Sequence, residues 1–270
     1  MSELVLEARE VSKIYPARGE RREIQALRDV SVEVRRGDTL GIVGESGSGK
    51  STLARLLLAL EQPSAGEIRF RDEVVSGLRE RDLAELRRNV QVVFQDPMGS
   101  LDPRMRIGTA IAEPLRALQI EGDHRARVAE LLDAVGLPAG CGSRYPHEFS
   151  GGQRQRIAIA RALAPHPTVL IADEAVSALD VSVRAQVLNL LNRLIADLGL
   201  TLVFISHDMS VIRYMCARVA VLYRGRLVEE GATDAIYERP RDPYTRSLLA
   251  AVPRLGHEVG EPELTAEVEA

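Results

Sequence analysis

One short segment limits the possible folds of this chain more than any other. Residues 44–51 read Gly-Glu-Ser-Gly-Ser-Gly-Lys-Ser, so two glycines separated by four residues are followed by Lys and Ser. Before this segment, the apolar run Thr39 to Val43 predicts a strand buried on both faces, and after it a helical pattern runs from Ser51 to Leu60. A strand, a glycine-rich loop and a helix in this order are the context expected of a phosphate-binding loop.

The residue types in this loop suit a triphosphate. Glycines let backbone N–H groups turn toward the phosphates, and the helix N-terminus adds positive potential. Lys50 would neutralise the β- and γ-phosphates, and the Ser51 hydroxyl would be a ligand of Mg²⁺. A simple glycine-rich turn is the alternative, but the chain has only two lysines, and a random match is expected in roughly one chain in a thousand. The predicted nucleotide contacts are Gly44, Glu45, Ser46, Gly47, Ser48, Gly49, Lys50, Ser51 and Thr52.

Composition argues against several other classes of protein. The net charge is −4, with 27% charged and 45% apolar residues, so a nucleic-acid partner has no electrostatic support. No apolar run reaches 18 residues, and the first 15 residues lack a basic segment followed by an apolar one, so we expect neither a membrane span nor a signal peptide. Cys141 and Cys216 have no metal-ligand spacing, and reduced thiols are expected. We therefore expect a cytosolic chain whose membrane role, if any, comes through a partner.

The order of the predicted elements indicates the fold class. Alternating patterns in 4–14 and 26–34 predict an antiparallel β layer, and helical periodicity dominates 96–163. Strands and helices then alternate, which predicts a parallel sheet flanked by helices. We expect an α/β fold, with a P-loop NTPase core, a mostly parallel sheet, an N-terminal antiparallel β layer and an inserted helical subdomain. The predicted domains are 1–95, the ATP-binding core with the β layer; 96–163, the helical subdomain; 164–231, the rest of the core; and 232–270, a C-terminal extension with an acidic tail.

Two carboxylates follow the predicted buried strand 168–172. Asp173 and Glu174 would lie at the C-terminal end of that strand, where parallel sheets bind ligands. Mg²⁺ with a nucleotide would offset their charge: Asp173 would hold the metal, and Glu174 would orient or deprotonate the attacking water. An Asp-Glu pair after a strand is, taken alone, often a helix cap or a solvated turn. The phosphate-binding loop is what favours the catalytic interpretation.

A second glycine-containing helix start lies in residues 150–153, Ser-Gly-Gly-Gln, and would suit another phosphate contact. Alone, this segment is equally typical of a helix cap and turn. Its place in an ordered series changes the interpretation: the loop at 44–51, Gln95 after an apolar strand, 150–153, Asp173-Glu174, Ser-Ala-Leu-Asp at 177–180, and His207 after the next strand. This series resembles the ATPase domain of ABC transporters along nearly the whole chain.

The resemblance implies a role for each member of the series. Tyr15 would stack on adenine, Gln95 would sense the γ-phosphate and Mg²⁺, and His207 would contact the γ-phosphate. Taken singly, Tyr15 could pack within its strand, Gln95 could be a polar strand end, and His207 could cap a helix. The predicted cofactors are ATP and Mg²⁺. The predicted catalytic residues are Glu174, His207 and Gln95, and the predicted metal ligands are Ser51, Gln95 and Asp173.

The resemblance also implies a dimer. In the family, the segment equivalent to Ser150, Gly151, Gly152 and Gln153 completes the site of the opposite subunit, so two ATP molecules lie between two head-to-tail cassettes and an isolated monomer hydrolyses poorly. This sequence departs from the family at two positions. Ala175 follows Glu174 where most relatives have Pro, and Phe149 stands where many have Leu. Neither change removes a ligand, so we expect little catalytic loss.

Three segments resemble the oligopeptide, dipeptide and nickel importers: 95–104, 145–150 and above all 241–253. Residues 50–55 resemble the second of their two ATPase subunits. This implies a paralogous ATPase as partner, with an identical copy as the alternative, together with two transmembrane permease subunits docked near Gln95 to Ile107. An extracytoplasmic solute-binding protein is also implied, and the chain would lie at the cytoplasmic face of the cell membrane. No residue here would touch the solute, so its identity stays open.

Other classes of function remain as alternatives. An importer for another solute, such as amino acids or metal complexes, is one alternative. Only the tail and the segment after Gln95 argue against it. A soluble ABC ATPase acting on ribosomes or DNA usually has two cassettes or an inserted coiled coil or zinc module, none of which the sequence contains. A phosphate-binding-loop enzyme outside the ABC family, such as a small-molecule kinase, gives no reason for the 150–153 segment.

Overall fold

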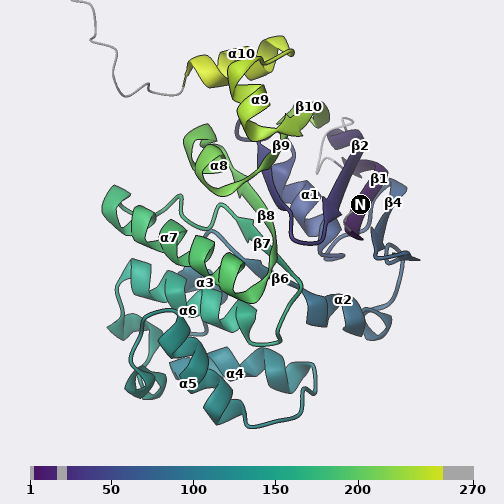
Figure 1. The fold of residues 1–270 in the computed structure, drawn as a ribbon. Helices are drawn as coiled ribbons and strands as arrows, with labels where there is room; N and C mark the ends of the chain where they lie inside the picture. Colours follow the sequence, from purple (N-terminus) through teal and green to yellow (C-terminus); the bar gives the residue numbers. More distant parts are fainter. Residues whose placement is uncertain (1–2, 17–22, 252–270) are drawn as a thin grey trace, which may run out of the picture.

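A six-stranded sheet lies at the centre of the protein, whose computed structural model describes residues 3–16 and 23–251 (Figure 1). The strand order is β10-β9-β3-β8-β7-β6, and all neighbours are parallel except β9 and β10. The prediction of a mostly parallel sheet is therefore confirmed. The strands are β3 (Thr39–Val43), β6 (Val90–Val93), β7 (Val169–Asp173), β8 (Thr201–Ser206), β9 (Arg218–Tyr223) and β10 (Arg226–Ala232).

The parallel strands are apolar on both faces because helices cover both faces of the sheet. β8 is buried along its whole length. In β7, Leu170 and Ile171 belong to two different apolar clusters, one on each side of the sheet. The first cluster includes residues of α6 (Gly151–Leu163), α7 (Val181–Leu198) and α8 (Met209–Met215), and the second includes residues of α1 (Lys50–Leu57).

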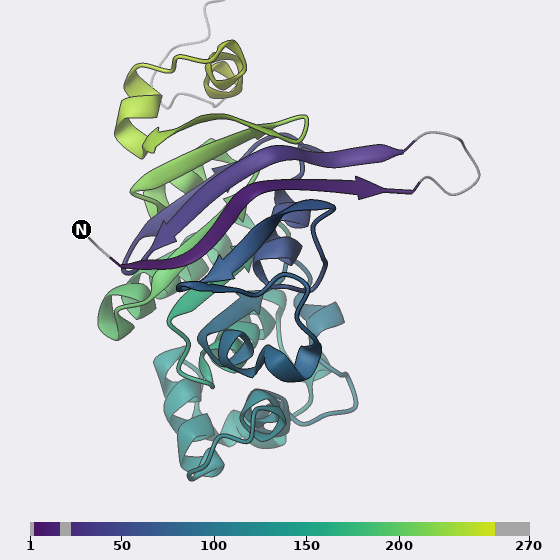
Figure 2. The same cartoon turned by 90° about the vertical axis from the view of Figure 1, so that its right-hand side faces the viewer.

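A second sheet, four-stranded and antiparallel, shares the apolar cluster of α1, which confirms the predicted β layer. Its order is β2-β1-β4-β5, and Figure 2 shows β1 and β2 as two long strands side by side. In β2 the buried residues Val30, Val32 and Val34 alternate with more exposed polar ones, as a half-buried strand requires. The strands are β1 (Leu4–Tyr15), β2 (Ile24–Arg35), β4 (Ala65–Phe70) and β5 (Glu73–Val74).

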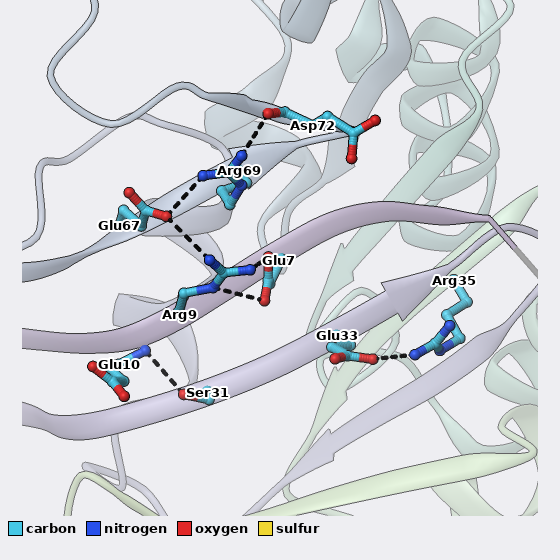
Figure 3. A network of polar contacts seen from close by, with 9 residues as sticks. All are labelled: Glu7, Arg9, Glu10, Ser31, Glu33, Arg35, Glu67, Arg69 and Asp72. Carbon is cyan, nitrogen blue, oxygen red and sulfur yellow. Dashed lines mark hydrogen bonds and ion pairs between the residues drawn. The ribbon is translucent and has the colours of Figure 1, made fainter.

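Ionic side chains cover the outer face of this antiparallel sheet (Figure 3). Arg9 of β1 donates two hydrogen bonds to the Glu7 carboxylate, at 3.2 and 3.1 Å, and its guanidinium lies 3.7 Å from Glu67 of β4. Arg69 donates to the same Glu67 carboxylate at 2.9 Å. Arg9 is exposed, so solvent screens these ion pairs and each contributes little to stability. The network therefore marks the solvent side of the layer, while the apolar cluster beneath it supplies most of the stability.

The helical subdomain lies at one end of the molecule, opposite α9 and α10 (Figure 1). Ile107, Ile111 and Leu115 of α4 join the first apolar cluster, and α6 leads back to β7. Between β5 and β6 the chain forms two short elements, a 3-10 turn at Glu80–Asp82 and the helix α2. The remaining helices are α2 (Ala84–Asn89), α3 (Pro97–Ser100), α4 (Ile107–Ala117), α5 (His124–Ala134), α9 (Thr233–Glu238) and α10 (Pro243–Ala250), with further 3-10 turns at Ala139–Ser143 and Pro146–Glu148.

Two further expectations concern parts of the chain beyond the sheets. Among the helices within residues 3–16 and 23–251, none is both long enough and apolar enough to cross a bilayer. The predicted acidic tail falls in residues 252–270, which lie outside the described part of the chain.

Candidate nucleotide-binding site

Four segments that are far apart in the sequence meet at one edge of the central sheet. The phosphate-binding loop follows β3, His207 follows β8, Asp173 ends β7, and Gln95 comes two residues after β6. These four strands are neighbours and parallel, so their carboxyl ends share one edge. Open α/β sheets bind ligands at this edge. The fold thus brings together the groups that the sequence pattern singled out.

Lys50 is held inside the loop that precedes it. Its side chain is buried, and its ammonium donates hydrogen bonds to the carbonyl oxygens of Gly44 at 2.8 Å and Glu45 at 2.9 Å. Burial lowers the pKa of Lys50, and the nearby carboxylates of Glu174 and Asp173 partly offset this shift. Within residues 3–16 and 23–251, this buried ammonium donates only to backbone carbonyls, so it is a cation placed to bind a stronger, anionic partner.

The tight curl of the loop requires glycine at both of its ends. Gly44 has φ +157°, and a Cβ there would lie 2.1 Å from the carbonyl oxygen of Leu222. Gly49 has φ +107°, and a Cβ there would lie 2.6 Å from the carbonyl oxygen of Ala26. Both contacts are with backbone atoms, which cannot move aside as a side chain can. Neighbouring strands therefore pack directly against the loop and hold its shape.

A separate observation indicates that the loop fits a polyphosphate. The Ser48 hydroxyl is buried and has no hydrogen-bond partner among the described residues. Buried polar groups in native proteins are nearly always satisfied, so an orphan hydroxyl beside a buried ammonium indicates a polar ligand. Gly47, with φ +79°, has open space where a Cβ would stand, and α1 begins at Lys50. A cation, an unpaired hydroxyl and a helix N-terminus together suit phosphate oxygens.

Ser51 and Asp173 form the part of the site suited to a metal ion. The Ser51 hydroxyl donates to the Asp173 carboxylate at 3.4 Å. Burial raises the pKa of Asp173, and the Ser51 hydrogen bond lowers it in part. Within the described chain no cluster of three or more His, Cys, Asp or Glu side chains could hold a metal. A hydroxyl and a carboxylate are oxygen donors, so this pair fits Mg²⁺, which is bound by one or two protein oxygens plus phosphates and water.

Glu174 and His207 face one another beside the Ser51–Asp173 pair. A Glu174 carboxylate oxygen lies 3.4 Å from Nδ1 of His207, and the glutamate side chain is 18% exposed against 57% for the histidine. Glu174 has φ +47°, an uncommon value for a residue with a side chain. Its N–H donates to the Ile205 carbonyl at 3.0 Å, and its own carbonyl accepts from the Ser177 hydroxyl at 2.9 Å. These bonds hold the strained backbone that directs the carboxylate, as is common at functional sites.

The other predicted contacts lie at the margin of the site. Gln95 is exposed beyond the end of β6. Tyr15 ends β1, its hydroxyl donates to Glu61 at 2.5 Å, and the Lys13 ammonium lies 5.0 Å from its ring centroid. Burial raises the pKa of Tyr15, the hydrogen bond to Glu61 raises it further, and the Thr52 hydroxyl lowers it. Tyr15 therefore lies against the first turn of α1, next to the phosphate-binding loop.

Residues 150–153 form a cap at the start of α6. The Ser150 hydroxyl accepts from the Gln153 N–H at 3.3 Å, and the Gln153 side-chain oxygen accepts from the Ser150 N–H at 3.0 Å. Ser150 and Gly151 are exposed, whereas Gly152 is buried. In the described part of the chain, no hydrogen bond joins this segment to the phosphate-binding loop. The structure of one chain thus leaves residues 150–153 outside the cluster formed at the sheet edge.

Gly152 also has a packing role that the sequence pattern did not indicate. A Cβ at Gly152 would lie 2.3 Å from a methyl of Val183, whereas a Cβ at Gly151 would meet nothing closer than 3.9 Å. Gly152→Ala is expected to lower the free energy of unfolding by about 1–3 kcal/mol, because Val183 is β-branched and cannot easily turn away. Urea unfolding measures this change. Gly151→Ala is the control, and Val183→Ala should restore most of the loss. Equal effects of the two alanine substitutions would contradict the packing role.

Two contacts to the loop come from residues that carry no recognised motif. The Gly225 N–H donates to the Ser48 carbonyl at 2.9 Å from the turn between β9 and β10. The Glu45 N–H donates to the hydroxyl of Tyr244 in α10 at 2.9 Å. Tyr244 lies in the 241–253 segment that resembles the peptide importers, but the sequence held no signal that this segment reaches the loop.

Solved structures similar to this chain include ATP-binding cassettes. A dimeric structure of a post-hydrolysis state of the ATP-binding cassette MJ0796 bound to ADP and Pi matches with a TM-score of 0.75 and 30% identity, covering 84% of this chain and 98% of that one. The structure of cbiO1 from Clostridium perfringens, part of the ABC transporter complex cbiONQ, matches with a TM-score of 0.76 and 27% identity, covering 88% of this chain and 92% of that one. The predicted α/β P-loop NTPase fold is therefore confirmed.

Family comparison agrees with the fold. Residues 27–177, more than half of the chain, match the ABC transporter family, and residues 228–268 match the oligopeptide/dipeptide transporter C-terminal region. The chain therefore belongs to the ABC transporter family, whose cassettes bind and hydrolyse ATP. The second match overlaps residues 241–253, where the sequence already resembled the oligopeptide and dipeptide transporters.

Curated relatives belong to the same branch of the family. The glutathione import ATP-binding protein GsiA of Escherichia coli strain K12 is 56% identical over 234 residues, which cover 86% of this chain and 38% of that protein. GsiA of Salmonella paratyphi A is 54% identical over the same lengths. The chain thus spans well under half of these relatives.

Proposed function

We propose that this chain hydrolyses ATP with Mg²⁺ as one of two paired cassettes, and so drives import of a peptide or a related solute through separate membrane subunits. The observation that carries the proposal is the convergence of Lys50, the Ser51–Asp173 pair and the Glu174–His207 pair at one sheet edge. These are a phosphate-binding cation, a metal-binding pair, and a base with a polar partner. The membership in the oligopeptide/dipeptide branch supports the direction of transport and the solute class.

Each residue has a chemical task in this proposal. Lys50 and the loop N–H groups bind the β- and γ-phosphates, and Tyr15 stacks on the adenine ring. Ser51, Asp173 and Gln95 hold Mg²⁺, which when bound neutralises charge on the phosphates. Glu174 accepts a proton from the attacking water, and His207 contacts the γ-phosphate and orients the Glu174 carboxylate.

A second cassette supplies the part of the site that this chain does not bring together. Ser150, Gly151 and Gly152 are not joined to the loop of their own chain by hydrogen bonds, and Ser150 and Gly151 are exposed. We propose that this segment, through Ser150 to Gln153, faces the γ-phosphate bound by the opposite cassette. A paralogous ATPase is the preferred partner, with an identical copy as the alternative.

The membrane subunits would dock on the groove between β6 and the helical subdomain. A cavity of ≈ 370 Å³ opens there, and Phe94 in it is 40% exposed. Arg161 spans its wall, with hydrogen bonds to the Ser100 carbonyl and the Glu113 carboxylate, both at 2.7 Å. A groove with an apolar floor and fixed polar sides suits a short helix of a permease. The chain would then lie peripherally at the cytoplasmic face of the cell membrane, with an extracytoplasmic solute-binding protein completing the system.

The solute is proposed only as a class. The relatives named above are glutathione importers by name, and glutathione is a small peptide. Short peptides are therefore the preferred solute, and a nickel complex or another solute class is the alternative.

Co-purification of the full-length chain from its native membranes tests the assembly. A tagged chain should bring down two multi-span membrane proteins and a second ATPase at comparable amounts. Recovery of ribosomes or DNA in place of membrane proteins would overturn the transport proposal. Recovery of the permeases with only identical copies of this chain would select the homodimer.

A further inference from the structure

The peptide group between Gly44 and Glu45 is held at both of its polar ends. Its carbonyl oxygen, on Gly44, accepts from the Lys50 ammonium at 2.8 Å. Its N–H, on Glu45, donates to the Tyr244 hydroxyl at 2.9 Å. A peptide group is planar, and its N–H and C=O point in opposite directions. Two bonds on opposite sides therefore prevent the plane from rotating and fix the direction of the carbonyl that holds Lys50.

Tyr244 is itself firmly placed. Its ring stacks on Tyr223, at the end of β9, with ring centroids 4.0 Å apart and planes inclined by 26°. The Asp242 carboxylate caps α10 by accepting from the Tyr244 N–H at 2.8 Å. Glu229 of β10 accepts from the N–H groups of Arg241 at 2.8 Å and Asp242 at 3.1 Å. The tyrosine hydroxyl thus contacts the loop from α10, a helix held in place by contacts with β9 and β10 of the central sheet.

Burial and charge agree with a functional contact at this place. Burial raises the pKa of Tyr244, and the Glu45 N–H lowers it in part, so the phenol stays neutral and can accept the hydrogen bond. Burial raises the pKa of Glu229, but the hydrogen bonds from the Arg241 and Asp242 N–H groups outweigh it and the net shift is downward. The carboxylate that anchors the start of α10 is therefore charged at neutral pH.

We propose that Tyr244 is a positioning residue for Lys50 and that it couples the C-terminal helix α10 to the occupancy of the phosphate-binding loop. This inference rests on the proposed function, because it requires the loop to bind a triphosphate. With the Gly44–Glu45 peptide fixed, the ammonium of Lys50 is directed before the phosphates arrive. Without the tyrosine hydroxyl, the peptide can rotate and Lys50 loses that preorganisation.

The coupling must act in both directions. If docking of α10 strengthens ATP binding, then bound ATP must strengthen the docking of α10 by the same factor. Amide hydrogen exchange in residues 243–250 should therefore slow when ATP binds. The first turn of α10 should respond most, since Tyr244 lies in that turn.

Three full-length chains test the proposal: the wild type, Tyr244→Phe, and Tyr214→Phe as the matched control. Tyr244→Phe keeps the ring on Tyr223 and removes only the hydroxyl that accepts from Glu45. Tyr214→Phe also removes a bonded hydroxyl, but from an exposed tyrosine that donates to Asn189 on α7. Equilibrium binding of ATP, thermal unfolding without nucleotide, and the KM and kcat for ATP hydrolysis are measured for each chain.

Tyr244→Phe is expected to weaken ATP binding about fivefold, because the Gly44–Glu45 peptide is no longer fixed before the phosphates arrive. KM should rise with it, while kcat at saturating ATP stays close to wild type. The melting temperature without nucleotide should fall only by the few degrees that one lost hydrogen bond causes. Tyr214→Phe should leave affinity and KM unchanged.

Two results together would overturn the coupling: Tyr244→Phe binds ATP with wild-type affinity, and the rate of amide hydrogen exchange in residues 243–250 of the wild type does not change when ATP binds. A loss of nucleotide-free stability with unchanged ATP affinity and KM would also overturn it, since that indicates a purely structural role. Failure of the wild-type chain to bind ATP would overturn the proposed function and this inference with it.

Discussion

Replacement of Glu174 with Gln is expected to reduce steady-state ATP hydrolysis at least about 100-fold and to leave ATP affinity within a few-fold of wild type. Removal of a general base typically costs this much. The amide has the size of the carboxylate but cannot take a proton from water, so the ATP-bound dimer should accumulate. Phosphate release and size-exclusion chromatography with ATP measure the two effects.

The control for this substitution is Glu130→Gln. Glu130 is an exposed residue of α5, in the helical subdomain, and pairs with Arg127 at 2.7 Å. Its neutralisation should change neither turnover nor the dimer. Wild-type hydrolysis by Glu174→Gln would refute the role given to the carboxylate. Loss of hydrolysis without an ATP-dependent dimer, either of this chain with itself or with its co-purified second ATPase, would refute the proposed closure by a second cassette.

Replacement of Lys50 with Ala is expected to weaken ATP binding itself by about 10- to 100-fold. Hydrogen bonds to charged groups contribute about 1.5–3 kcal/mol each, and each 1.4 kcal/mol is a tenfold change in affinity. Lys50 is the buried cation of the loop, and the carbonyls of Gly44 and Glu45 would also lose their donor. Equilibrium binding of ATP to the purified variant measures the change independently of turnover.

Arg193→Ala removes one cation at a distance from the loop and is the matched control. Arg193 lies on α7, and its guanidinium donates to the Ala134 carbonyl at 2.9 Å. This variant should bind ATP as the wild type does. If Lys50→Ala binds ATP with unchanged affinity, the buried ammonium is not the phosphate-binding group.

Much of the site could be predicted because its parts are local in the sequence. The loop at 44–51 carries its glycines, lysine and serine in one run, between a strand and a helix that the same stretch predicts. Asp173 ends a strand that the structure places next to β8 and β6, and Glu174 directly follows that strand. Parallel strands bring their carboxyl ends to one edge, so the βα alternation was enough to expect that the carboxylates and the loop meet.

The parts that could not be predicted depend on contacts between distant segments. The membership of β4 and β5 in the antiparallel sheet is set by pairing with β1, which local periodicity does not reveal. The contact of Tyr244 with Glu45 joins two residues 199 positions apart. Gly152 has the pattern of a phosphate-binding glycine, and only its distance to Val183 shows that packing also requires glycine there.

The account as a whole depends on one arrangement: a triphosphate enclosed by the loop of one cassette and by residues 150–153 of another. The most direct test is an experimentally determined structure of the Glu174→Gln variant with ATP and Mg²⁺. The expected result is a γ-phosphate between Lys50 and the Ser150 segment of the facing chain. A loop without nucleotide, or a Ser150 segment exposed to solvent in the ATP-bound state, would contradict it.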